Sequence, residues 1–300
     1  MKYLFTGALV AAATVAAAPA SAATLELEPS SEWKLRAYDD KCRMIGSFGE
    51  GDNAVMLWLE KGSPGPFLNV SLIGRPFRSP FGSWIELAFL PGKPINRGYI
   101  GTTSSKGRPV ITMFGVAPIS FDPDDGSQTS MADDKEVIDL STEVEKNFAS
   151  PDILAERYEA VQAFELSGPL VQKVSLKTGG LGAVMQQLDR CIEAMAQKRS
   201  IAMGTDATTL NVASWAMQIQ RDYPSYLLRD KAIGSVGVRV EISPEGRATF
   251  CEVTKYEGSA GFTDPACLGM LRYSRFNPAT DMDGNPVAGN YSTRISYRVN

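Results

Sequence analysis

The sequence predicts an α+β protein in which a larger β-rich unit precedes a smaller unit of three strands and two helices. Short runs of alternating apolar and polar residues, separated by proline and glycine, fill the first third of the chain. One long helical pattern follows at 180–198. After residue 220 the pattern becomes helix, strand, strand, helix and strand. These three observations define the expected fold class.

The N-terminal unit is predicted to be a meandering antiparallel sheet that ends in the long helix. Proline and glycine recur between its runs, which favours short antiparallel connections over the long crossovers of a parallel sheet. The expected strands cover residues 33–38, 41–48, 54–60, 67–73, 83–90, 109–114 and 160–167.

The helix predicted at 180–198 carries a single apolar stripe. Its apolar members recur at helical spacing, and they are Leu181, Val184, Met185, Leu188, Cys191, Ile192 and Met195. Cys191 is therefore expected on the buried face of this helix. We expect it to reach Cys42, which lies on an early strand of the sheet.

The C-terminal pattern is compact, and each of its parts has a physical reason. Proline suits the first turn of a helix because its missing N–H is not needed there. Threonine and aspartate are good residues at a helix start. The expected elements are a helix after Tyr223-Pro224, strands at 235–242 and 247–256, a helix that Thr263-Asp264-Pro265 caps and begins, and a strand at 291–299.

Four cysteines allow three disulfide pairings, and the sequence alone does not determine which one forms. The expected elements favour one pair in each unit, Cys42 with Cys191 and Cys251 with Cys267. Neither pair is a C-x-x-C motif, so structural roles are favoured over reactive ones. A disulfide that closes a loop as short as that between Cys251 and Cys267 adds about 3 kcal/mol by loop-closure entropy.

The first 22 residues are predicted to be a secretory signal peptide. Lys2 precedes a short alanine-rich apolar stretch, and Ala20-Ser21-Ala22 ends it with small residues suited to cleavage after Ala22. The competing interpretation is an uncleaved anchor, although the stretch is shorter and less apolar than a typical membrane-spanning helix. Cleavage would release the protein into a compartment where disulfides form.

Beyond the signal peptide, the predicted domains cover residues 23–203 and 211–300. The small polar run from Gly204 to Thr209 indicates a linker at 204–210. The charge balance changes at the same place, because the chain after residue 206 carries ten basic and nine acidic side chains and the part before it is acidic.

The composition excludes several classes of function. The chain has no histidine, which removes Ser-His-Asp catalysis and imidazole-based metal sites. Its formal net charge of −4 gives no support for nucleic-acid binding. Neither a cofactor nor a metal is predicted.

A hydrolase sited in the N-terminal domain is the alternative from another functional class. The carboxylates available to it are Asp39, Asp40, Glu86 and the group Asp122 to Asp125. Nothing in their spacing pairs two carboxylates across a site. The sequence therefore predicts that the chain is not an enzyme.

Five elements make the C-terminal unit resemble a known family. They occur in order as Tyr223-Pro224, Gly234 to Val240, Pro244 to Arg247, Arg272 to Ala279, and Asp283 to Val287. Residues 220–300 resemble the TonB C-terminal domain family. The resemblance implies a three-stranded antiparallel sheet with helices on one face, which binds a short extended segment at the periplasmic end of outer-membrane receptors. Such a segment adds a strand to the edge of the sheet.

The resemblance places the receiving edge on the final strand. The candidate partner-binding residues are Tyr291, Ser292, Thr293, Arg294, Ile295, Ser296, Tyr297 and Arg298. Outward arginines favour an acidic partner segment, but arginine on an exposed edge also protects it from unwanted pairing, and the sequence leaves both interpretations open. Two copies that pair through this strand would form a homodimer. The family also uses the region that corresponds to 218–222 near its partner.

The chain departs from a typical TonB energy transducer, which has a membrane anchor and a proline-rich spacer. Here a predicted signal peptide and a globular domain stand in their place, with no proline-rich run. Without its signal peptide, the chain cannot transmit force from the inner membrane. We therefore expect a periplasmic TonB-like binding or adaptor protein associated with TonB-type transmembrane transport. A transducer retained by an uncleaved anchor is the alternative.

Overall fold

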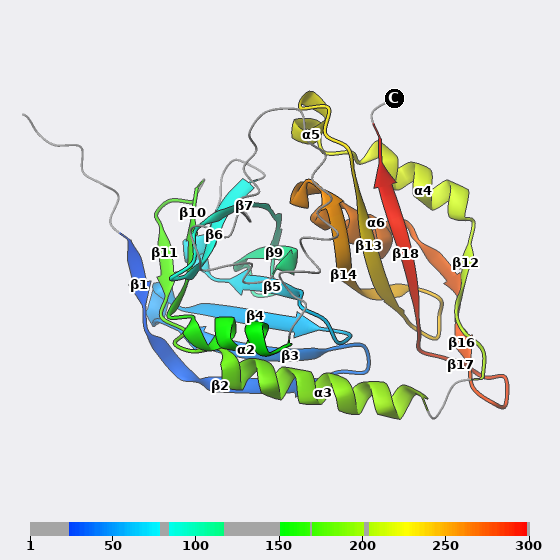
Figure 1. Cartoon of the computed structure of the whole chain (residues 1–300), viewed down its shortest axis with the longest axis horizontal. Helices are drawn as coiled ribbons and strands as arrows, with labels where there is room; N and C mark the ends of the chain where they lie inside the picture. Colours follow the sequence, from blue (N-terminus) through cyan, green and yellow to red (C-terminus); the bar gives the residue numbers. More distant parts are fainter. Residues whose placement is uncertain (1–23, 79–83, 117–150, 169, 201–203, 299–300) are drawn as a thin grey trace, which may run out of the picture.

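In the described residues, the N-terminal part of the chain contains two β-sheets and the helices α2 and α3, and a separate three-stranded sheet dominates the C-terminal part (Figure 1). The computed structural model describes residues 24–78, 84–116, 151–168, 170–200 and 204–298. The predicted signal peptide at 1–22 and the carboxylates at 122–125 lie outside the described residues.

A six-stranded antiparallel sheet holds much of the N-terminal core. In spatial order its strands are β2 (Pro29–Ala37), β3 (Cys42–Phe48), β4 (Val55–Lys61), β5 (Leu68–Ile73), β9 (Pro109–Val116) and β8 (Ile100–Thr103). The sequence predicts five of these six strands. It misses β8, whose Ile-Gly-Thr-Thr run is too short to show an alternating apolar pattern.

A second sheet makes the N-terminal part different from the single antiparallel meander that the sequence predicts. Its order is β1 (Leu25–Leu27), β11 (Val174–Leu176), β10 (Ala163–Ser167), β6 (Trp84–Leu90) and β7 (Ile95–Gly98). Strands β1 and β11 pair in parallel although they lie far apart in the sequence. The predicted antiparallel β-rich fold class is confirmed, but the division into two sheets is not visible in the sequence, because alternation reports which face of a strand is buried and not which strand lies beside it.

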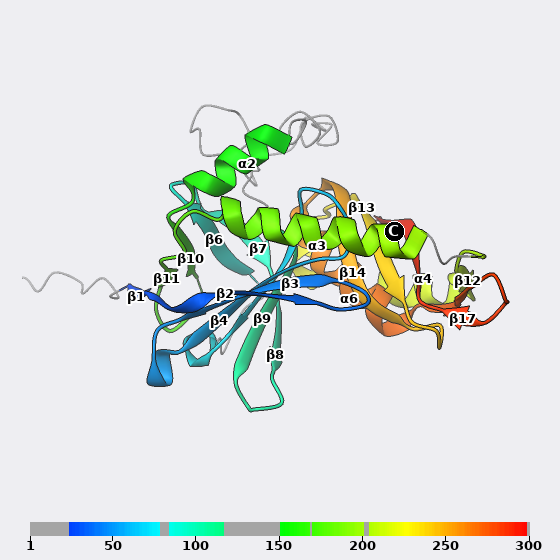
Figure 2. The same ribbon diagram turned by 90° about the horizontal axis from the view of Figure 1, so that it is seen from below.

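Helix α3 (Gly182–Ser200) crosses one face of the six-stranded sheet (Figure 2). Its buried side chains belong to the predicted stripe and include Val184, Met185, Leu188 and Ile192. Cys191 forms a disulfide with Cys42 of β3, with the two Cα atoms 6.2 Å apart. The shorter helix α2 (Pro151–Ala160) packs against α3. The disulfide thus joins the long helix to the sheet as the stripe predicts.

The C-terminal sheet has the order β14-β13-β18, and both of its pairings are antiparallel. The predicted order of helix, strand, strand, helix and strand is confirmed by α5, β13, β14, α6 and β18. Helix α6 packs on β14 and β13, and Cys267 on this helix forms a disulfide with Cys251 on β14. The elements are β12 (Thr208–Leu210), α4 (Val212–Arg221), α5 (Ser225–Arg229), β13 (Gly234–Ile242), β14 (Ala248–Gly258), α6 (Thr263–Tyr273), β15 (Arg275–Asn277), β16 (Ala279–Thr280), β17 (Pro286–Val287) and β18 (Gly289–Tyr297).

The stretch 204–210, expected to be a linker, lies along the C-terminal part. Strand β12 within it pairs with β15, and Thr205 forms a bridge with Thr280. Helix α4 follows directly and has no counterpart among the expected elements. Its signal is present in the sequence, because the buried Trp215 and Ile219 lie four residues apart on one helical face.

Two hydrophobic clusters form the interior, and one of them draws residues from both parts of the chain. The first lies between the N-terminal sheets and α3. The second fills the C-terminal part but also includes Phe67, just before β5, and Phe114 of β9. The two parts are therefore joined by apolar packing as well as by the chain. Among the described residues, no helix has the length and apolar character needed to span a membrane.

Candidate functional site

Strand β18 forms one edge of the C-terminal sheet. It pairs with β13 from Gly289, opposite Ile242, to Tyr297, opposite Gly234. No other strand in the described part of the chain pairs with its second side. Figure 1 shows that this edge faces away from the N-terminal sheets. An edge strand offers unpaired N–H and C=O groups, which are the template for an added strand.

The side chains of β18 alternate between the core and the surface. Ile295 is buried, and so is Tyr297, whose ring stacks on Phe262 at a centroid distance of 4.5 Å. The side chains predicted to point outward are all exposed, and they are Ser292, Arg294, Ser296 and Arg298. The buried positions anchor the strand in the core and leave the outward face to solvent.

Neighbouring segments flank both ends of the β18 edge. At its start, Gly289 lies so close to β16 that a Cβ atom on it would be 2.7 Å from the Cβ of Ala279. At its end, Nε2 of Gln220 on α4 donates a hydrogen bond to the carbonyl of Ser296 at 2.7 Å. The N–H and C=O groups of successive residues in a strand point to opposite sides. The N–H and C=O groups of Ser292 and Arg294 therefore point to the same side as the Ser296 carbonyl. The open part of the edge is therefore the middle of the strand.

The two outward arginines of β18 have different surroundings. Nη2 of Arg294 lies 2.7 Å from Oε1 of Glu257 on β14. To reach β14, the Arg294 side chain passes over β13 at Gly237, which is the residue that pairs with Arg294. Arg298 lies beyond the last residue of β18 and is exposed. Half of the predicted positive charge on this face is thus already paired within the sheet.

Two of the family-like motifs are held together by a close backbone approach. Gly246, in the turn between β13 and β14, has φ of +74°, and a Cβ atom there would lie 2.1 Å from the carbonyl oxygen of Phe276. Its own carbonyl accepts a hydrogen bond from the Phe276 N–H at 3.1 Å. Only glycine satisfies both the left-handed φ and this contact. The conformation of this turn and the position of the segment after α6 therefore depend on each other.

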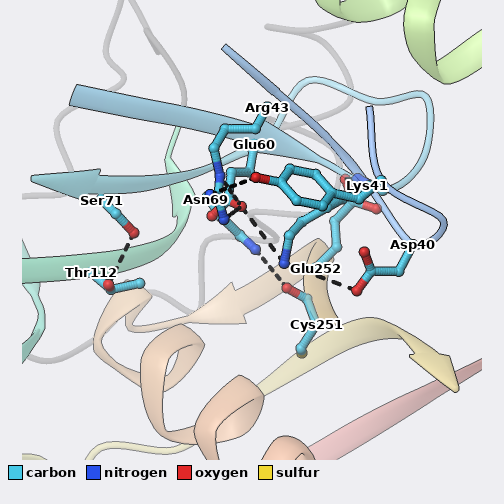
Figure 3. Close-up of polar contacts among 11 residues, drawn as sticks. Asp40, Lys41, Arg43, Glu60, Asn69, Ser71, Thr112, Cys251 and Glu252 are labelled. Atoms are coloured by element: carbon cyan, nitrogen blue, oxygen red, sulfur yellow. Dashed lines mark hydrogen bonds and ion pairs between the residues drawn. The ribbon is translucent and has the colours of Figure 1, made fainter. Parts of the chain in front are cut away.

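Strand β14, at the opposite edge of the same sheet, meets the N-terminal part through buried polar contacts (Figure 3). Nδ2 of Asn69 on β5 donates a hydrogen bond to the carbonyl of Cys251 at 2.6 Å. The carboxylate of Glu252 accepts hydrogen bonds from the N–H of Gly62 and the hydroxyl of Ser63. Burial raises the pKa of Glu252. These contacts close the β14 edge.

A second set of polar contacts surrounds Phe114 at the end of β9. Its carbonyl accepts a hydrogen bond from the buried Arg97, and its N–H donates to the carboxylate of Asp264 at 2.8 Å. Asp264 is almost fully buried, and this burial raises its pKa to about 7. Thr263 and Asp264 are expected to cap α6. Instead, Thr263 donates to the carbonyl of Ala260 and Asp264 turns toward β9, because the N-terminal part covers this end of α6.

The sequence misses two residues that join the N-terminal part to the C-terminal part, Asn69 at β14 and Arg97 at α6. Asn69 is the one amide in the apolar run of β5, where every residue is buried, and a lone amide in such a run is a signal for a specific hydrogen-bond partner. Arg97 lies on the short strand β7, where the sequence shows no strand pattern. Both residues meet the C-terminal part only after the chain has folded.

Among the described residues, the carboxylates of the hydrolase alternative do not lie in one site. Glu86 lies on β6 in the five-stranded sheet and accepts a hydrogen bond from Ser167 at 2.7 Å. Asp39 and Asp40 lie at the turn between β2 and β3 in the other sheet, where Asp40 is 3.9 Å from Lys41. Within the described ranges, no group of three or more acidic or cysteine residues has the geometry of a metal site.

The C-terminal part thus has the form of a small α+β domain with one closed and one open sheet edge. Residues 219–299 match the family described as Gram-negative bacterial TonB protein C-terminal, which confirms the resemblance for this segment. That family is a non-enzymatic, transport-associated domain of the Gram-negative envelope. No curated protein and no solved structure matches the chain significantly. The match indicates a TonB-like envelope protein that works through protein–protein interaction.

Proposed function

We propose that this chain is an exported periplasmic protein that binds an extended peptide segment through the open edge of β18. The proposed partner is a TonB-dependent outer-membrane receptor or another envelope protein of the same transport systems. The observation that carries the proposal is the contrast between a β14 edge closed by buried contacts and a β18 edge that no described strand covers. The division into domains at 23–203 and 211–300 is part of the proposal.

The middle of β18 is the part of the edge that we assign to the partner. Gln220 already occupies the Ser296 carbonyl, so an added strand would pair mainly with the outward backbone groups of Ser292 and Arg294. Each main-chain hydrogen bond contributes about 1 kcal/mol net, and a short edge therefore supports weak, reversible binding. The positive charges of Arg294 and Arg298 would add a preference for an acidic partner segment.

A proline at position 292 tests strand addition. Ser292→Pro removes the N–H that the edge would donate and places a ring where the added strand must lie. The variant should still fold, because proline is tolerated on edge strands. We expect at least a tenfold loss of affinity for short synthetic peptides taken from the periplasmic ends of outer-membrane receptors, measured by fluorescence anisotropy with the full chain.

The matched control is Ser292→Ala, which removes the same hydroxyl but keeps the N–H. We expect its affinity to equal that of the wild type, and thermal unfolding shows whether both variants fold. Equal affinity of folded Ser292→Pro and Ser292→Ala for every bound peptide would contradict strand addition at β18.

Self-association through the same edge is distinguished by oligomeric state. If β18 pairs with β18 of a second copy, light scattering after size exclusion gives a dimer, and Ser292→Pro converts it to a monomer. We expect a monomer for the wild type, because the open middle of the edge is short and offers few main-chain hydrogen bonds to a second copy.

The exported form is also part of the proposal. Signal cleavage after Ala22 predicts that intact mass measurement of the protein from the envelope fraction gives a chain that starts at Ala23. A mass that includes residues 1–22, together with retention in the inner membrane, would favour the energy transducer instead. We propose binding in place of catalysis because β18 offers an open sheet edge, whereas the described carboxylates of the hydrolase alternative, Glu86 and the pair Asp39 and Asp40, lie in separate sheets.

A further inference from the structure

A basic hollow lies at the end of the six-stranded sheet that is remote from the C-terminal part. Strands β4 and β5 pair from Glu60 with Asn69 at one end to Met56 with Ile73 at the other. Asn69 contacts Cys251, so the first end meets the C-terminal part. Beyond the second end lies a hollow of about 590 Å³, and the charged side chains that line it are Asp52, Arg75, Arg78, Lys106 and Arg108.

The segment that carries Arg75 and Arg78 is held in place by buried neighbours. It forms a 3₁₀ turn, Arg75–Phe77, in which Pro76 and Phe77 are buried. The N–H of Gly74, just before it, donates a hydrogen bond to the carbonyl of Pro109 at the start of β9 at 3.0 Å. The two arginines on either side of Phe77 therefore project from a fixed backbone.

The other two cations come from the tight turn between β8 and β9. This turn is closed by a hydrogen bond from the N–H of Ser104 to the carbonyl of Arg108 at 2.8 Å. The hydroxyl of Ser104 also accepts a hydrogen bond from the Arg108 N–H at 3.0 Å. Lys106 lies at the tip between them. Because Gly74 ties this hairpin to the 3₁₀ turn, four cations that line one hollow come from two segments whose backbones are held together.

The charge of the hollow is opposite to that of the whole chain. Four cationic side chains face one carboxylate among the described lining residues, that of Asp52, which pairs with Arg75 at 2.6 Å. The local charge is therefore +3, whereas the chain carries a formal net charge of −4. A concave wall with one sign of charge concentrates the field of its cations and attracts ions of the opposite sign.

The chemistry of this hollow selects for a phosphate group. Arginine forks bind the oxygens of phosphate in pairs and lysine adds a point charge. A single exposed ion pair contributes little binding free energy. A ligand with several negative charges contacts three or four cations at once, so it is favoured over a simple carboxylate. The size of the hollow is within the usual range for small-ligand sites.

We propose that this hollow binds a multiply charged phosphate group, carried by a phosphorylated small molecule or by a lipid headgroup. It lies at the opposite end of the sheet from the C-terminal part, so the proposal does not depend on strand addition at β18. It would give the N-terminal part a binding role of its own, at a distance from the peptide edge.

The test uses the full chain and inorganic pyrophosphate as the probe, in calorimetric titrations at low ionic strength. Lys106→Gln with Arg108→Gln removes two cations from an exposed turn without touching the core. The matched control, Lys34→Gln with Arg190→Gln, removes two exposed cations elsewhere. We expect at least a tenfold loss of pyrophosphate affinity in the hollow variant and less than a twofold change in the control. Cosedimentation with vesicles that contain phosphatidic acid, whose phosphomonoester carries up to two negative charges, against phosphatidylcholine vesicles, tests the lipid source.

Pyrophosphate binding that only the hollow variant loses supports a small phosphorylated ligand. Binding to phosphatidic acid vesicles alone, lost in the same variant, supports a lipid headgroup. The proposal is overturned if neither probe binds the wild type, or if the hollow variant and the control lose binding equally, because the attraction would then reflect general surface charge.

Discussion

At each edge of the C-terminal sheet, a backbone carbonyl accepts a hydrogen bond from a side-chain amide, but this contact is buried at one edge and exposed at the other. At β14, the amide of Asn69 donates to the carbonyl of Cys251, and both groups are buried. At β18, the amide of Gln220 donates to the carbonyl of Ser296 at the surface. The first amide comes from the N-terminal part, and the second comes from α4 of the same C-terminal part. One edge is thus closed by another part of the protein, whereas the other is only touched at its end.

This difference shows what the N-terminal part does for the sheet. It covers β14 with apolar residues such as Phe67 and Phe114 and with the amide of Asn69, so β18 is the more open edge of the sheet. A small domain with two open edges would be open to self-association on both sides. Under the proposed function, the N-terminal part would therefore direct strand addition to β18, a structural role that the sequence pattern does not show.

The largest expected effect concerns pH and the closed side of the sheet. Burial raises the pKa of Asp264 from 3.8 to about 7, so the folded state binds this proton more tightly than the unfolded state does. The associated stability is fully present below about pH 4 and is lost as pH rises through about 7. A shift of about three pKa units corresponds to about 4 kcal/mol.

Asp264→Asn checks this expectation, because asparagine keeps an oxygen for the Phe114 N–H but does not ionise. The free energy of unfolding, measured by urea at a series of pH values, should fall between pH 4 and 8 for the wild type and fall much less for the variant. Glu252, whose pKa burial also raises, leaves a residual slope in the same direction. Parallel pH profiles for the two proteins would contradict the burial of Asp264.

The second expectation compares the two amides directly by their effect on stability. Asn69→Ala leaves the buried carbonyl of Cys251 without its donor, which costs about 1–3 kcal/mol. Gln220→Ala exposes the Ser296 carbonyl to water, which replaces the donor, and the cost should stay below about 0.5 kcal/mol. Urea unfolding of both variants measures the difference. Equal losses would mean that the two edges do not differ in burial.

The third expectation separates the two interpretations of the arginines on β18. If Arg294 attracts an acidic segment, Arg294→Gln lowers the affinity for acidic peptides about threefold, since an exposed pair contributes about 0.2–1 kcal/mol. Neutral peptides should bind unchanged. If the arginine instead protects the edge, the variant keeps its peptide affinity and self-associates more readily in light scattering.

The smallest expected effect is on peptide affinity at the end of the edge. Gln220→Ala frees the Ser296 carbonyl for an incoming strand, so peptide affinity should rise by about twofold, because water competes for the same carbonyl. Fluorescence anisotropy with the peptides used for Ser292→Pro measures this change. A loss of affinity would mean that Gln220 itself contacts the partner, as the resemblance at 218–222 implies.

The sequence was sufficient for features that depend on local periodicity. Alternation along β18 predicts which side chains of that strand are buried, and the apolar stripe of α3 places Cys191 on the side that faces Cys42. The five motif elements led to the family that matches residues 219–299. Helix α4 was missed although Trp215 and Ile219 carry a short apolar pattern, because ten residues are few for a periodic signal.

Tertiary structure alone decided the features that join distant segments. The parallel pairing of β1 with β11, the closure of the β14 edge by Asn69, and the convergence of the cations around Asp52 all unite residues far apart in the chain. Periodicity determines which face of an element is buried, since burial acts on each residue in turn. It carries no information on which element lies opposite, because that depends on how all faces pack at once. The sequence by itself therefore determined the elements with a clear periodic pattern and the kind of C-terminal domain, and packing decided which edge stays open.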